Sequence, residues 1–206
     1  MYNNKVELIG YYGSDLSHCL SAWTSTSRDL TEDKKSRVGK LLTMLATDGH
    51  HTPFEKSMLH FLINCETASH IHIIKHRIAV SVNSESARYK ELKSDKYHIP
   101  QDWPIGEREL LELHCRDSFE RYHSCLARLI AGGMDRKRAK ESARFYLPYA
   151  NSLTLDVSFN FRSFIAFQKL RNDDHAQLEI HQIAQQMLDL VRGTGSFPLS
   201  LEAFGY

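Results

Sequence analysis

The pattern of hydrophobic and polar residues predicts both strands and helices. In residues 151–161 every second residue is apolar, from Leu153 to Phe161, and the residues between them are polar. A period of two is typical of a strand with one buried face. Apolar runs at residues 5–12 and 57–66 indicate two further strands.

Apolar residues recur at helical spacing in the remaining segments. Thr31 is a typical N-cap residue, the apolar positions from Val38 to Leu45 continue a helix, and Asp48-Gly49 is a typical end. The same reasoning predicts helices at residues 14–23, 68–77, 106–131, 135–146, 162–170 and 175–191. Because no repeat, low-complexity tract or linker separates these elements, we expect one domain over residues 1–206.

Composition and charge exclude several classes of partner. The 206 residues are 42% hydrophobic and 25% charged, and 26 Lys and Arg against 25 Asp and Glu give a net charge of +1. A nucleic-acid-binding domain is normally strongly basic, so we expect no nucleic-acid partner. The first residues, MYNNKVELIG, lack the features of a signal peptide or a membrane span, which favours a cytoplasmic protein without a membrane partner.

The four cysteines show no CxxC pair and fall in segments predicted to be regular structure, so we expect reduced thiols.

The densest candidate chemistry lies between residues 72 and 89. Lys75, His76 and Arg77 form a basic triplet, and Ser86 and Arg88 follow it. Guanidinium groups, hydroxyls and backbone N–H groups together can bind phosphate. From the residues alone, the stretch is either such an anion site or a solvated basic turn.

Four further blocks place polar residues where predicted strands or helices end: residues 49–55, 143–148, 160–163 and 170–180. Each has an ordinary structural interpretation. His50 and His51 suit surface caps, Asn160 suits a helix cap, and Arg144 complements a helix dipole.

In order, the five blocks resemble the signature of the flavin-dependent thymidylate synthases over residues 49–181. That family has an Arg-His-Arg triplet followed by Ser-Gly-Arg-Tyr, and Lys75 and Ala87 replace the first Arg and the Gly. Residues 49–55 match Gly-His-x-Thr-Pro-Phe-Glu, and residues 170–180 match Leu-Arg-x-x-x-His-Ala-Gln-x-Glu-Ile. The resemblance implies an α+β fold, a single domain with a curved antiparallel sheet flanked by helices.

The resemblance also implies roles for individual residues. The catalytic residues would be Arg171, which favours the ionised N3 of the pyrimidine and so enriches C5 in electrons, and His50, near flavin and substrate. The implied cofactor-binding residues are Thr52, Glu55, Lys75, His76, Arg77, Ile78, Ser84, Asn160, Arg162 and Ala166. The implied substrate-binding residues are His72, Lys75, Ser84, Glu85, Ser86, Ala87, Arg88, Arg144 and Arg171. No metal ligand is implied.

The implied reaction is the reductive methylation of dUMP to dTMP with bound FAD, using methylenetetrahydrofolate and NADPH as co-substrates. The family assembles as a homotetramer with shared active sites, which we therefore expect here. Four departures concern affinity and geometry: Lys75 replaces an Arg, Ser84 a frequent Glu, His72 a common Gln, and Ala166 an Asn or His. Glu85, beside Ser84, can take part of the role of the missing Glu.

Three alternatives stay open. A metal site would use His70, His72 and His76 with other histidines, although HIIKH lacks the Glu of the HExxH zincins and Lys75 would repel a cation. A catalytically silent nucleotide-binding protein would lack flavin absorbance and NADPH oxidation. A variant enzyme would modify C5 of another pyrimidine nucleotide, for example by hydroxymethyl transfer.

Overall fold

A computed structural model of the protein describes residues 4–86, 88–92 and 96–206. Four strands form one sheet in the order β1-β2-β4-β3, with bounds Lys5–Tyr12 (β1), Met58–Glu66 (β2), Val80–Ser84 (β3) and Ser152–Asn160 (β4). Asn160 N donates to Ala79 O at 3.2 Å and Glu85 N to Thr154 O at 2.8 Å, so β3 and β4 run antiparallel. The predicted α+β class with an antiparallel sheet is confirmed.

Nine α-helices are described: α1 (Asp15–Trp23), α2 (Glu32–Ser36), α3 (Val38–Thr47), α4 (Thr67–Ile74), α5 (Ile105–Ala131), α6 (Arg136–Ala143), α7 (Phe161–Arg171), α8 (Leu178–Gly193) and α9 (Pro198–Ala203). Two short 3₁₀ helices accompany them, η1 (Thr52–Glu55) and η2 (Arg144–Tyr146). Among the described residues, the chain divides into two compact units. Unit 1 is Asn4, Asn64–Ile73 and Asn83–Leu155, and unit 2 is Lys5–Ile63, Ile74–Val82 and Asp156–Tyr206. The expectation of a single domain stays a prediction.

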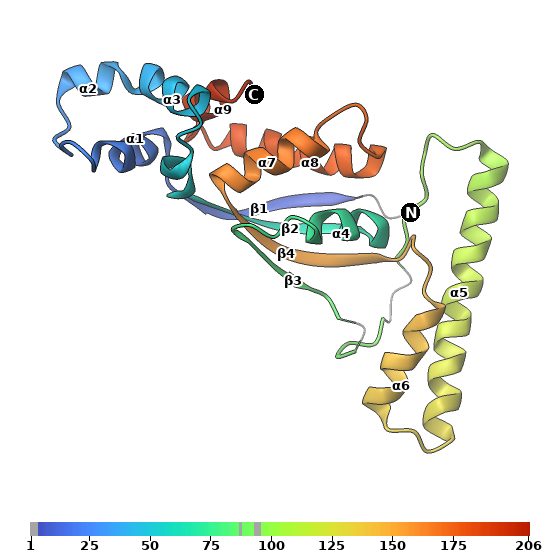
Figure 1. Ribbon diagram of the computed structural model, residues 1–206. Helices are drawn as coiled ribbons and strands as arrows, with labels where there is room; N and C mark the ends of the chain where they lie inside the picture. Colours follow the sequence, from blue (N-terminus) through green and yellow to red (C-terminus); the bar gives the residue numbers. More distant parts are fainter. Residues whose placement is uncertain (1–3, 87, 93–95) are drawn as a thin grey trace. The chain divides into compact units, whose positions relative to one another are not determined.

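Unit 2 is built on an aromatic core. Helix α8 packs against β1 and α7, and Figure 1 shows the two helices lying side by side. The fully buried rings of this core are Phe54, Phe61, Phe159, Phe161, Phe164, Phe167 and Phe197. The alternation predicted for residues 151–161 accounts for Phe159, which lies on the inward face of β4, whereas Phe161 is the first residue of α7.

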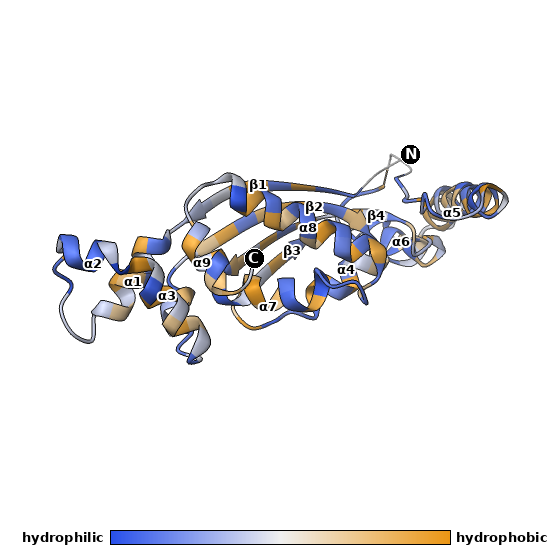
Figure 2. Cartoon of the chain, turned by 90° about the horizontal axis from the view of Figure 1, so that it is seen from above, coloured by the Kyte–Doolittle hydropathy of each residue, from blue (hydrophilic) through white to orange (hydrophobic). Residues whose placement is uncertain are grey.

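Unit 1 contains a helical hairpin in which α5 and α6 lie side by side (Figure 1). Its small core consists of Leu92, Tyr122, Leu126, Ala139 and Ala143. Figure 2 shows hydrophilic and hydrophobic residues interleaved along α5, whose buried residues are Cys115, Ser118, Phe119, Tyr122 and Leu126. Leu92 N donates to the buried Tyr122 hydroxyl at 3.2 Å, which fixes the chain against the hairpin.

The sequence-based elements were correct in most places, although the helix predicted at residues 135–146 ends at Ala143, before η2, and the one predicted at residues 175–191 begins at Leu178. The helix predicted from Thr31 to Asp48 is two helices, α2 and α3, separated at Arg37. No residue of α2 is buried, so no tertiary packing stabilises α2 and α3 as one continuous helix. The helix predicted at residues 68–77 ends at Ile74, and β3 and α9, both short, were not predicted.

All four cysteines are free thiols, as expected, and Cys19, Cys65 and Cys115 are buried while Cys125 of α5 is partly buried. Burial raises the pKa of Cys19 to about 12 and that of Cys115 to about 11, and it also raises the pKa of Cys65.

Candidate active site

A pocket of about 400 Å³ opens in unit 2 around the basic triplet. Three segments far apart in sequence form its wall: η1, the chain between α4 and β3, and the start of α7. The lining residues are Glu55, Lys75, His76, Arg77, Ile78, Ala79, Val80, Asn160, Arg162, Ser163 and Ala166. The structure therefore brings eight of the ten residues expected to bind the cofactor into one cavity, which we call the unit 2 pocket.

The turn that precedes β3 is held by the start of α7. Asn160 caps α7 through its side chain, which accepts from Ser163 N at 2.8 Å, and its own N–H donates to Ala79 O. Ser163 Oγ donates to Ile78 O at 2.6 Å. These bonds keep Ala79 in a left-handed conformation with φ of +51°, which a residue with a Cβ adopts only under local strain.

Charge in the unit 2 pocket is organised by one ion pair. Arg162 donates to Glu55 at 2.5 Å, joining α7 to η1. Lys75 and Arg77 add two further cations to the lining. With one carboxylate against three cations, the pocket suits an anionic ligand.

Arg171 and His76 meet in the same unit. Arg171 Nε donates to His76 Nε2 at 3.2 Å, so this ring nitrogen acts as the acceptor of a neutral imidazole. The rings of His76 and Phe167 pack in a T-shaped arrangement, with centroids 4.9 Å apart. Two blocks of the signature, the basic triplet and residues 170–180, are thus joined by a direct contact.

A second pocket, of about 560 Å³, lies in unit 1. Its wall contains the end of β3, the start of α4, η2 and the segment that leads into β4. The lining residues are Thr67, His70, Ser84, Glu85, Ser86, Arg144, Leu147, Pro148, Tyr149, Asn151 and Leu153. We call this cavity the unit 1 pocket, and it gathers four residues expected to bind substrate: Ser84, Glu85, Ser86 and Arg144.

The carboxylate of Glu85 is already engaged. It accepts from Lys90 Nζ at 2.7 Å and from Thr154 N at 3.3 Å. Burial acts to raise the pKa of Glu85, but the Lys90 ammonium and the Thr154 N–H outweigh burial and hold this pKa below its ordinary value. These contacts hold the Glu85 carboxylate in the wall of the unit 1 pocket and join it to β4, and its expected role in binding substrate stays a prediction.

His70 and Ser84 form a polar pair, with His70 Nε2 and Ser84 Oγ 3.1 Å apart. Burial lowers the pKa of His70, which favours the neutral imidazole. The unit 1 pocket thus offers the Arg144 cation, two serine hydroxyls and a neutral histidine. Such a donor set matches a phosphate monoester.

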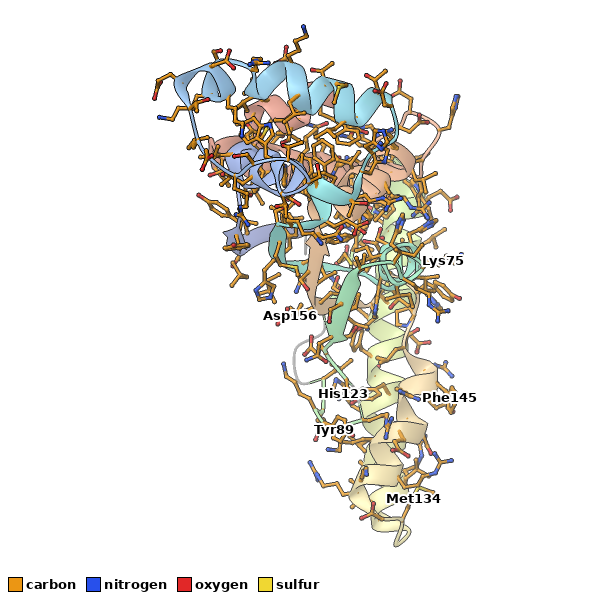
Figure 3. All side chains as sticks on the ribbon, turned by 60° about the vertical axis from the view of Figure 1, so that its left-hand side comes forward. Lys75, Tyr89, His123, Met134, Phe145 and Asp156 are labelled. Atoms are coloured by element: carbon orange, nitrogen blue, oxygen red, sulfur yellow. The ribbon has the colours of Figure 1, made fainter. Side chains whose placement is uncertain are left out.

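The remaining expected residues lie elsewhere. Arg88, which is described but not in the lining, pairs with Glu141 at 3.2 Å and lies over the ring of Tyr89, the residue labelled in Figure 3. His50 and Thr52 are exposed and, among the described residues, lie outside the lining of the unit 2 pocket. His72 is on α4, and Ala87 lies outside the described residues. The binding roles of all these residues stay predictions.

Sequence analysis missed several lining residues. In unit 2 these include Ser163, which the three-residue spacing from the Asn160 cap could have indicated. In unit 1, His70 was considered only as a metal ligand, and Tyr149 and Asn151 were not considered. No local signal separates these residues from ordinary surface residues.

Two classes of site find no support in residues 4–86, 88–92 and 96–206. Within these ranges, no group of three or more His, Cys, Asp and Glu side chains is arranged to hold a metal ion. No helix in the same ranges is both long and apolar enough to cross a membrane.

Fold and pockets together define an α+β protein with two cavities suited to phosphorylated ligands. The family model described as thymidylate synthase complementing protein matches residues 7–195. The flavin-dependent thymidylate synthase of Pseudothermotoga lettingae is 35% identical over 190 residues, covering 87% of this chain and 80% of that protein. The flavin-dependent thymidylate synthase of Kosmotoga olearia is 29% identical over 215 residues, covering 97% of this chain and 89% of that protein.

A solved structure is similar over nearly its whole length. The UMP/dUMP methylase PolB from Streptomyces cacaoi, bound with 5-Br dUMP, superposes with a TM-score of 0.79 at 25% identity, covering 98% of this chain and 94% of PolB. The chain belongs to the family of flavin-dependent thymidylate synthases, as the signature blocks predicted.

Proposed function

We propose that this chain catalyses the reductive methylation of dUMP to dTMP, with methylenetetrahydrofolate giving the carbon and NADPH the reducing equivalents. The observation that carries this proposal is the convergence of Ser84, Ser86 and Arg144 in the unit 1 pocket. They come from two separate blocks of the family signature, and their donors suit the phosphate of a nucleotide. Membership of the family and the likeness to a dUMP methylase support the same reaction.

The unit 2 pocket fits part of a flavin dinucleotide. Lys75, Arg77 and Arg162 supply positive charge for its phosphates, and the small side chains of Ala79 and Ala166 leave room in the wall. When bound, FAD would supply the redox chemistry of the reaction. The protein residues bind and orient it, and the Glu55–Arg162 pair keeps one cation of the lining in a fixed place.

The residues expected from the family resemblance to bind the nucleotide would act by electrostatics and positioning. Arg144 would neutralise the phosphate, and Ser84 and Ser86 would donate hydroxyl hydrogen bonds to it. Arg171, oriented by His76, would favour the ionised N3 of the pyrimidine and so raise electron density at C5, the carbon to be methylated. The family resemblance further supports a cytoplasmic homotetramer with shared active sites, which size and sedimentation measurements would test.

A matched pair of arginine variants tests the assignment of the two pockets. Arg144→Gln should weaken dUMP binding by about 1.5–3 kcal/mol, the usual scale of a charge-assisted hydrogen bond, and leave FAD affinity unchanged. Arg162→Gln should weaken FAD binding and leave dUMP affinity unchanged. Titration of FAD and dUMP into both variants and wild type measures this. Loss of FAD in Arg144→Gln with normal dUMP binding would overturn the assignment.

A second substrate has specific support, because the PolB neighbour is named as a methylase of UMP as well as dUMP. Turnover with dUMP alone would make the chain a thymidylate synthase in the strict sense. Comparable formation of 5-methyl-UMP from UMP would place it with the dual-specificity methylases. Mass spectrometry of the nucleotide products, with methylenetetrahydrofolate and NADPH present, distinguishes the two.

A further inference from the structure

His18 of α1 is a fully buried histidine with a partner at each ring nitrogen. Nδ1 lies 2.9 Å from Ser200 Oγ of α9, and Nε2 lies 2.8 Å from Ser57 Oγ, just after η1. Burial lowers the pKa of His18 to about 4, so the ring is neutral at physiological pH, with one donor and one acceptor nitrogen. Each serine hydroxyl can give or take a hydrogen bond, so both nitrogens are satisfied.

The serines on both sides of His18 are themselves held. The buried carboxylate of Asp15 accepts from Leu199 N at 2.9 Å and from Ser200 N at 2.8 Å, which fixes Ser200. Gly13, with φ of +101°, packs against Ser57 so closely that an added Cβ would lie 2.6 Å from Ser57 Cβ. His18 therefore connects two rigid points, and an apolar residue would fill the space without this connection.

The ring of His18 packs between residues that adjoin the ion pair of the unit 2 pocket. Its centroid is 5.2 Å from that of Phe54, the residue before Glu55, and 5.1 Å from that of Phe161, the residue before Arg162. Glu55 and Arg162 themselves meet at 2.5 Å and line the pocket. One imidazole thus contacts the immediate neighbours of both charged residues, and its bond to Ser57 fixes the chain two residues beyond Glu55.

We propose that His18 is a positioning residue for the cofactor pocket, which sets the separation of η1 and α7 and thereby the Glu55–Arg162 ion pair. The role of the pair in holding FAD rests on the proposed function; the positioning of the pair does not. No block of the family signature contains residue 18, so this role comes from the packing and not from the resemblance.

His18→Phe is the central variant, because it keeps a ring in the core and removes both hydrogen bonds. At a temperature where His18→Phe is fully folded, we expect this variant to bind FAD about tenfold more weakly than the wild type does. The reason is that the Glu55–Arg162 ion pair would no longer be held in one geometry. Ser57→Ala, which removes one of the bonds, should weaken FAD two- to fivefold. Met187→Ala, a truncation at a buried position of α8, is the control for lost stability and should leave FAD affinity within twofold.

A double-mutant cycle separates positioning from general destabilisation. In an Arg162→Gln background, where the pair no longer exists, His18→Phe should change FAD affinity by less than twofold while lowering the midpoint of thermal unfolding as much as before. A full tenfold loss in that background, or FAD affinity unchanged within twofold in folded His18→Phe, would overturn the proposal.

A measurement without flavin keeps the two proposals distinguishable. By NMR at low temperature, the Arg162 Nη–H protons, which are donated to Glu55 in the ion pair, should exchange with water at least tenfold more slowly in the wild type than in His18→Phe. Equal exchange rates would refute the positioning role even if FAD binds normally. Conversely, a wild type that binds no FAD but shows the protected Arg162 would refute the proposed function and leave the positioning intact.

Discussion

The two pockets are held in place by different kinds of structure. In unit 2, the lining residues adjoin fully buried rings: Glu55 follows Phe54, and Arg162 follows Phe161. Because close-packed cores have low compressibility, the backbone that carries these two lining residues is held firmly by the core behind it. Such a wall is suited to a ligand that stays bound, as the proposed cofactor does.

In unit 1, the pocket wall is held mainly by polar contacts near its surface. Glu85 is fixed through Lys90 and Thr154, His70 contacts Ser84, and Arg144 lies in the exposed turn η2. Phe145, beside Arg144, is 81% exposed and projects outward from the hairpin (Figure 3). A wall of this kind can relax and reform at low energetic cost, which suits a substrate that enters and leaves in every turnover.

The largest effect should follow from removing one ring of the unit 2 core. Phe161→Ala deletes a fully buried ring that packs against His18, Phe164 and Phe197, and should lower the free energy of unfolding by about 3–5 kcal/mol. Phe145→Ala, the same change at the exposed position in unit 1, should cost less than about 0.5 kcal/mol. Urea denaturation followed by circular dichroism measures both free energies. Equal losses of stability in the two variants would show that the two positions do not differ in packing as described.

Acid should act on the two units in different pH windows. The folded pKa of His18, about 4, is below the unfolded value, so its contribution to stability is complete above about pH 6.5 and is lost as pH falls toward 4. The stability advantage of wild type over His18→Phe should therefore shrink by on the order of 3 kcal/mol between pH 7 and 4. Denaturation curves at several pH values measure it.

Glu85 of unit 1 provides the comparison for this experiment. Its folded pKa is also lowered, so its contribution is complete above the ordinary carboxylate pKa and is lost only below it. Glu85→Gln should leave the pH dependence of the free energy of unfolding unchanged between pH 7 and 5 and make it less steep at lower pH. If Glu85→Gln made the pH dependence less steep between pH 7 and 5, the loss of stability in that range would not belong to His18 alone.

The smallest effect concerns Lys75, the position in the unit 2 pocket where this chain departs from the basic triplet of the family. Lys75→Arg restores a planar fork of donors and should tighten FAD by about 0.5–1.5 kcal/mol, the net worth of one added hydrogen bond. Lys75→Ala should weaken it. If flavin titration finds the same affinity in wild type and both variants, Lys75 makes no contact with the cofactor.

Long elements with a clear period were predictable from the sequence. Strand β4 was found within one residue because its apolar residues alternate with polar ones, and three of them, Leu155, Val157 and Phe159, are fully buried. Helix α5 was found because its apolar pattern is long. Strand β3 was missed, since a five-residue segment with two apolar residues has no distinctive period. It forms because Glu85 and Ala79 bond to β4, a tertiary effect that no local pattern contains.

The site was predictable as a set of residues and not as two cavities. The blocks identified Lys75, Arg162 and Arg144 by type and order, but only the folded chain separates the lining into two pockets. The roles of His70 and His18 could not be predicted from the sequence for the same reason. A histidine becomes a pocket residue or a buried link through partners distant in sequence, such as Ser84 and Ser200.

The uneven burial of the four thiols makes the natural chain selectively labelable. Maleimides react with the thiolate, and burial both shields Cys19, Cys65 and Cys115 and raises their pKa. Cys125, the partly buried cysteine of α5, is the position that a dye should reach first. A fluorophore attached there would report on the helical hairpin of unit 1 while nucleotide binds, without a single engineered cysteine.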